Sequence, residues 1–342
     1  MISKFAVLVF LLAAMSVTAG CGSASVKTRP APPPIDEDLA ALAPDGFNQV
    51  LWLNLSVFKN SPLWTTATTF AKEEILAQIQ TATGIDVLTQ VNEILIIGGI
   101  ANTQKEFLAL IKGTFDANAA VSNGNTEKSP DSIIPLNIVK VETPPLVITA
   151  LTGRTIAVGT QKIVEQSVAL TKGVGRSLRQ NPNFKDFNLA PDSAAALRLK
   201  RDVTSSSHTL SNDLPLPKFK WTDSITDIDT TLTISEGFTI AINANLGTPN
   251  TASAARKDLE HAINDIMENP FVMMLGVRWL FEKITFDNKD SKLNVTMSLD
   301  AADMDKVLEL TARLKKIRDM LKPVPPQKDN QKEETKPEEI KQ

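Results

Sequence analysis

The sequence has little of several residue types that carry chemistry. Its 342 residues include no tyrosine, two histidines and a single cysteine. One thiol cannot form an intramolecular disulfide, and the usual zinc and copper sites need several histidine or cysteine ligands. We therefore predict a body held together by packing alone, with no metal and no cofactor.

Strong charge and long apolar runs are also missing. The net charge is only −3, which predicts no general attraction to nucleic acid. Beyond the first twenty residues, no segment is apolar over the roughly 20 residues that a membrane-spanning helix needs. Both observations favour an exported body that relies on its amino terminus for any contact with a membrane.

The amino terminus has the order of a secretory signal peptide. Lys4 supplies a positive start, residues 5–15 form an apolar core, and Thr18-Ala19-Gly20 lead to Cys21. The apolar run is too short to cross a bilayer as a helix. We expect residues 1–20 to be removed on export.

The sequence Val17-Thr-Ala-Gly-Cys21 resembles the lipobox of bacterial lipoproteins, with small residues at the two positions before the cysteine. The resemblance implies that the Cys21 thiol carries a diacylglyceryl lipid and that the chain is cut before it. Several acyl chains anchor a protein stably. In a Gram-negative envelope, Gly22 resembles the pattern sent on to the periplasmic face of the outer membrane. The alternative is a free Cys21 after an ordinary signal peptide.

Composition divides the rest of the chain. Proline-rich residues form a flexible linker, a seam rich in Asn and Pro separates two α+β units, and a charged tail is expected to be disordered. The predicted parts are the lipidated cysteine and linker (21–37), the first unit (38–180), the seam (179–193), the second unit (190–321) and the tail (322–342).

Strand patterns are clearest in the second unit. Residues 225–234, 238–246 and 292–299 alternate apolar and polar side chains, which predicts half-buried antiparallel strands. Amphipathic helices are predicted over 251–269, 271–284 and 300–321, with Thr251 or Ser253 capping the first and Asp300 the last. The predicted fold class is α+β, with antiparallel sheets and helices packed on one face.

The first unit shows a similar order of elements. A strand over residues 49–55 precedes a helix that begins at Ser61-Pro62, and further strand segments and two shorter helices follow. We hypothesise two similar α+β units, because the order of elements matches although the residues do not.

Catalytic motifs are not evident. His208 and the Asp223, Asp227 and Asp229 group are the best hydrolase candidates, but no Gly-x-Ser-x-Gly elbow accompanies them. We interpret the acids as charges on the solvent-facing side of a strand, and the basic run 198–201 as a solvated strand end. Trp52 and Trp64 are read as core residues, with a shared apolar pocket as the alternative. We predict that the chain is not an enzyme.

Polar side chains on the wet face of the second unit form a candidate binding face. Its members are Thr231, Asn243, Asn245, Asn294, Thr296 and Ser298. The leading hypothesis is a non-enzymatic, lipid-anchored envelope protein that binds another protein or a cell-wall polymer there. The alternatives are a carrier of lipid or another apolar ligand between sheet and helices, and a hydrolase.

Overall fold

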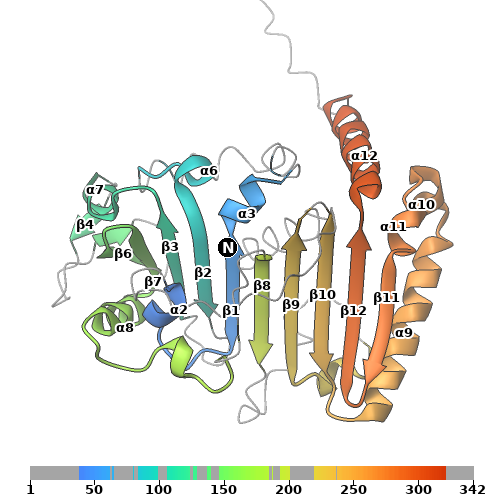
Figure 1. The fold of residues 1–342 in the computed structure, drawn as a ribbon, viewed down its shortest axis with the longest axis horizontal. Helices are drawn as coiled ribbons and strands as arrows, with labels where there is room; N and C mark the ends of the chain where they lie inside the picture. The colour runs from blue at the N-terminus through green and yellow to red at the C-terminus, as the bar shows by residue number, and fades with distance from the viewer. Residues whose placement is uncertain are drawn as a thin grey trace, which may run out of the picture.

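The computed structural model describes most of the predicted body (Figure 1). The described residues are 38–61, 64, 80, 84–98, 106–123, 126–128, 137–139, 146–184, 187, 193–200, 219–235 and 237–320. Cys21, the predicted linker, the predicted tail and His208 lie outside them, as does most of the helix expected after Ser61.

Twelve antiparallel strands form one sheet, in the order β11-β12-β10-β9-β8-β1-β2-β3-β7-β6-β5-β4 (Figure 1). The strands are β1 (Gln49–Asn54), β2 (Val91–Gly98), β3 (Phe107–Gly113), β4 (Thr126–Lys128), β5 (Asn137–Val139), β6 (Leu146–Thr152), β7 (Thr155–Gly159), β8 (Ser193–Lys200), β9 (Asp227–Ile234), β10 (Phe238–Asn245), β11 (Ile284–Lys289) and β12 (Lys292–Leu299). The predicted α+β class with antiparallel strands is confirmed.

The helices join and cover these strands. They are α2 (Leu39–Leu42), α3 (Leu55–Lys59), α6 (Val87–Gln90), α7 (Ala117–Asn123), α8 (Gln161–Thr171), α9 (Pro249–Met267), α10 (Pro270–Leu275), α11 (Arg278–Phe281) and α12 (Ala301–Met320), with short 3₁₀ turns at Leu178–Gln180 and Thr222–Ser224. Among the described residues, no helix combines the length and the apolar character that crossing a membrane requires.

The two halves of the sheet share one topology. The first half runs β1-β2-β3-β7-β6 and the second β8-β9-β10-β12-β11. In each half three consecutive strands are neighbours, and the second strand of the hairpin that follows pairs with the third of them. The third strand and this hairpin are separated by α7, β4 and β5 in the first half and by α9, α10 and α11 in the second, and a helix follows the hairpin in both. The first strands of the halves, β1 and β8, pair with each other. This supports the hypothesis of two similar units, and it makes them parts of one sheet.

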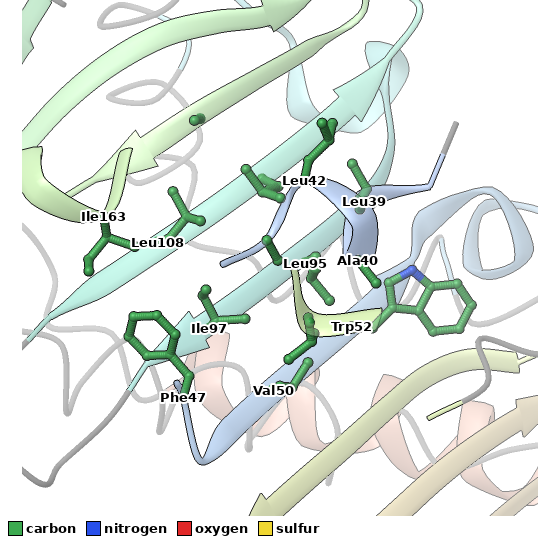
Figure 2. Close-up of a cluster of buried hydrophobic side chains, with 14 of the residues drawn as sticks. Leu39, Ala40, Leu42, Phe47, Val50, Trp52, Leu95, Ile97, Leu108 and Ile163 are labelled. Atoms are coloured by element: carbon green, nitrogen blue, oxygen red, sulfur yellow. The ribbon is translucent and has the colours of Figure 1, made fainter. Parts of the chain in front are cut away.

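One face of the first half is buried under α2 and α8. Val50 and Trp52 on β1, Leu95 on β2 and Leu108 on β3 are at most 2% exposed and pack with Leu42 (Figure 2). The predicted seam also contributes to this cluster, because Phe184 and Phe187 are buried in it. Residues around the seam therefore belong to the core of the first half.

The opposite face carries the core of the second half. Ala252 and Ala255 of α9 are fully buried and pack near Leu293 of β12. Towards the other end of the strands, Met304 of α12 packs with Phe238 and Leu299. The small alanine side chains allow α9 to approach the strands closely, and Leu259 of the same helix packs against this cluster.

The helix ends differ in part from prediction. Helix α9 begins three residues earlier than expected: the hydroxyl of Thr248 accepts a hydrogen bond from the backbone N–H of Thr251, and Pro249 occupies the first turn. The expected caps Thr251 and Ser253 are thus wrong. The cap at Asp300 is confirmed, because its carboxylate accepts from the N–H of Asp303 at 2.9 Å.

Candidate functional site

The six residues of the predicted binding face lie on one face of neighbouring strands. Asn243 on β10 stands opposite Asn294 on β12 and opposite Asp229 on β9. Since alternate residues of a strand point to the same side, Thr231, Asn245, Thr296 and Ser298 share this face. We call the six residues the polar face.

The polar face is open to solvent in part. Thr231, Asn243 and Ser298 are exposed, and the other three members are half-buried. The intervening residues on the same strands point to the opposite side, where Leu232 and Phe238 are buried. This alternation is the pattern expected of a sheet with one dry and one wet side.

A difference between the two halves leaves the polar face uncovered. In the first half, Ile163 and Val164 of α8 pack against the sheet on the side of Val50. The corresponding helix of the second half is α12, which follows the hairpin of β11 and β12 as α8 follows the hairpin of β6 and β7. Its Met304 packs on the opposite side of the sheet, and the helix then runs out beyond the strand ends (Figure 1). Polar side chains are tolerated on the polar face because, within the described ranges, no helix packs on them as α8 packs on its side of the sheet.

The centre of the polar face holds side chains with unused hydrogen-bonding groups. Within the described part of the chain, the side chains of Thr231, Asn243 and Asn294 form no hydrogen bond with other residues. Two amides and a hydroxyl supply both donors and acceptors. Neighbouring strands lie about 4.8 Å apart, so the paired side chains of Asn243 and Asn294 are closely spaced.

A charged border lies at one end of the polar face. The guanidinium of Arg198 on β8 donates two hydrogen bonds to Asp229, at 2.5 and 3.1 Å. Lys200 lies 3.8 Å from Asp227, which also accepts from Asn245 at 3.3 Å. The prediction of a solvated strand end is therefore wrong for Arg198 and Lys200, which pair with acids of β9. Their spacing of two residues, matched by that of Asp227 and Asp229, is the signal that they face a partner strand.

Neighbouring contacts fix the edges of the polar face. The amide oxygen of Asn245 accepts from the hydroxyl of Ser291 at 3.0 Å and from the N–H of Gly247 at 3.2 Å. The hydroxyls of Thr239 and Ser298 lie 3.1 Å apart. Asn245 is therefore engaged within the protein, and the free hydrogen-bonding capacity is concentrated at the centre.

The hydrolase candidates are not brought together as a catalytic group among the described residues. Asp227 forms an ion pair with Lys200 and Asp229 with Arg198, and Asp223 is an exposed residue of a 3₁₀ turn. The second histidine of the sequence, His261, is exposed on α9. His208 is outside the described chain. Nor does the described part contain a group of three His, Cys, Asp or Glu residues placed to hold a metal ion.

The two tryptophans of the alternative pocket belong to different clusters. Trp52 is 2% exposed in the core beneath α2. Trp64 makes an edge-on contact with Phe58 of α3, at 5.9 Å between ring centroids, and Phe58 packs against the cluster of Leu232 and Phe238 on the other side of the sheet. Their shared pocket is therefore not formed, and Trp52 is the core residue that we predicted.

Comparison with known proteins gives a likeness in structure alone. No protein family matches the sequence, and a search of curated proteins returns no match. Among solved structures, crystal form I of TP0453 aligns over 80% of this chain and 98% of its own, with 11% identity and a TM-score of 0.46. Crystal form IV of the same protein aligns over 80% of this chain and 95% of its own, with 12% identity and a TM-score of 0.45.

Proposed function

We propose that this chain is an exported, lipid-anchored envelope protein that binds a partner without catalysing a reaction, and that the polar face is its binding surface. The observation that carries this proposal is the set of unengaged side chains at the centre of that face: Thr231, Asn243 and Asn294. They offer hydrogen bonds from one face of the sheet, and neither amide can act as a general base for the Thr231 hydroxyl.

The composition of the polar face favours a polar polymer of the cell wall over a folded protein. The residues that contribute most to the affinity of protein interfaces are enriched in Trp, Tyr and Arg, whereas Ser and Thr are under-represented among them. The six residues of the polar face are all Asn, Ser or Thr, and the charges of the border are paired within the chain. A glycan has hydroxyl and amide groups along its length, so it can match such an array by hydrogen bonds alone.

Cosedimentation with purified, insoluble cell-wall polymer tests this proposal. The mature chain with Cys21→Ser is compared with the same chain carrying Asn243→Ala and Asn294→Ala, and we expect binding at least tenfold weaker for the double variant. Asn264→Ala, on the exposed side of α9, is the matched control and keeps full binding. Equal binding by all three chains would rule out the polar face as the site.

The anchor is tested separately from the face. We expect the intact mass of the chain from the membrane fraction to carry the added mass of a diacylglyceryl group on Cys21. A Cys21→Ser variant that remains equally membrane-bound and identically processed would contradict the lipid attachment.

A further inference from the structure

Exposed apolar side chains gather at one place in the described chain. Of the four large apolar residues that stand out by exposure, three lie at the end of α9 and in α10: Ile266 is 39% exposed, Met273 51% and Met274 74%. Single exposed apolar residues are ordinary on protein surfaces, but a cluster marks an interaction site. We call these three residues the methionine patch.

Two of the three residues of the methionine patch lie on one short helix. Helix α10 has the sequence Pro-Phe-Val-Met-Met-Leu, which contains no charged residue, and it ends where Gly276 takes a positive φ of 66°. The N–H of Met273 donates to the carbonyl of Asn269 at 3.1 Å. The helix lies beside the end of α9, at a corner of the molecule away from β1 and β8 (Figure 1).

A second copy of the chain is a poor occupant for so small a surface. Stable dimers bury about 800 Å² on each partner. Three side chains, two of them adjacent in sequence, fall well short of that area. A bilayer needs no such area if the chain is already attached to it, because an anchor converts weak binding into a contact at high effective concentration.

The length of chain before α2 sets how far the body can stand from its anchor. The segment from residue 22 to residue 37 has 16 residues, and an extended chain of that length spans up to about 55 Å. The anchor alone therefore leaves the orientation of the body open. Flexible thioether side chains suit insertion among acyl chains, since methionine adapts to irregular apolar surroundings.

We propose that the methionine patch inserts into the surface of the bilayer to which the chain is anchored and so fixes the orientation of the body. This inference rests on the membrane attachment of the proposed function. The charges near the patch include exposed Glu268 and the ion pair of Arg278 with Glu282 at 3.1 Å, so they give no net positive surface. The contact is driven by apolar burial and requires no anionic lipid.

Methionine oxidation tests the proposal on the wild-type chain. Cys21 is the only cysteine, so the mature chain is coupled through it either to a maleimide lipid in phosphatidylcholine vesicles or to a soluble maleimide polyethylene glycol. Both samples are treated with chloramine-T, and sulfoxide at Met273 and Met274 is followed by mass spectrometry. We expect oxidation at least fivefold slower on the vesicles.

A Val174→Met variant provides the internal control. Val174 is 61% exposed and follows α8 in the first half, so a methionine there should oxidise at the same rate on both carriers. Equal rates at Met273 and Met274 on the two carriers would overturn the proposal. Protection on the soluble carrier that grows with protein concentration would also overturn it, in favour of a second copy. Because the coupling is chemical, either result is independent of whether the cell lipidates Cys21.

Discussion

At the residue scale, Gly159 shows how closely the central strands of the first half approach each other. It pairs with Leu108 on β3 and with Val147 on β6. A Cβ atom at this position would lie 2.2 Å from the carbonyl oxygen of Phe107 and 3.0 Å from the Cα of Leu108. Both obstacles are backbone atoms of a paired strand, so they cannot move aside without disturbing the ladder.

We therefore expect Gly159→Ala to lower the free energy of unfolding by about 1–3 kcal/mol, the usual cost of overpacking. Urea unfolding of the two chains measures the difference. Gly153→Ala is the control, since a Cβ there meets nothing within 4 Å, and surface changes of this kind stay within about 0.5 kcal/mol. Similar losses for both variants would show that the close approach is not the cause.

Asp303 is a buried carboxylate that joins α12 to the body. It is 2% exposed, forms an ion pair with Lys283 and accepts from the ammonium of Lys306 at 3.0 Å. Burial by itself raises the pKa of Asp303, but hydrogen bonds from Lys283, Lys306 and the backbone outweigh it and hold the pKa below its ordinary value. The ionised form is thus favoured in the folded protein.

This lowered pKa gives a pH dependence with a definite sign. The stabilisation by Asp303 is complete above the ordinary carboxyl pKa of about 3.9 and is lost as the pH falls through the lower folded value. We expect Asp303→Asn to be less stable than wild type at pH 7, and the difference to shrink below about pH 4. Thermal unfolding at several pH values measures it, with exposed Asp305→Asn as control. A difference that widens on acidification would contradict this assignment.

At the scale of single elements, β9 is the clearest two-sided strand. Leu232 is 5% exposed against the helices, and Thr231 next to it is an exposed member of the polar face. Leu232→Ala is expected to cost about 2–5 kcal/mol in unfolding free energy, the range for large-to-small changes in a core. Thr231→Ala should cost less than about 1 kcal/mol. Chemical denaturation of the two variants measures these free energies of unfolding. Comparable decreases for Leu232→Ala and Thr231→Ala would argue against an open polar face.

The same two-sidedness explains which elements could be predicted. Strands β9, β10 and β12 alternate apolar and polar residues, so their existence and the shared face of Thr231, Asn243 and Asn294 followed from a period of two. The bounds of β12 were predicted correctly, whereas β9 begins two residues later than predicted and β10 ends one residue earlier. Helix α2 has only four residues, too few to show a helical period, although Leu39 and Leu42 lie at the centre of a core. Its role depends on contacts with residues far along the chain, which local patterns do not contain.

At the scale of the whole molecule, the least predictable feature is the pairing of β1 with β8. Val50 pairs with Arg198, which lies 148 positions later in the chain, and the register of the two strands, with Leu51 opposite Leu197, is set by the whole topology. Sequence order alone predicted two similar units, but not that they share a single sheet. The open polar face likewise depends on where α12 leaves the sheet, which its own amphipathic pattern does not specify.

The junction of β1 and β8 has a consequence for the way the protein can misassemble. β1 and β8 would each be an unpaired edge strand if the two halves did not pair with each other. Unpaired edge strands are sites of aggregation. If the halves of one molecule separate, the edges of its β1 and β8 become unpaired, and each of these edges matches the edge that its partner presents in another copy. We therefore expect domain swapping to be the route of misassembly, in which β1 of one copy pairs with β8 of another.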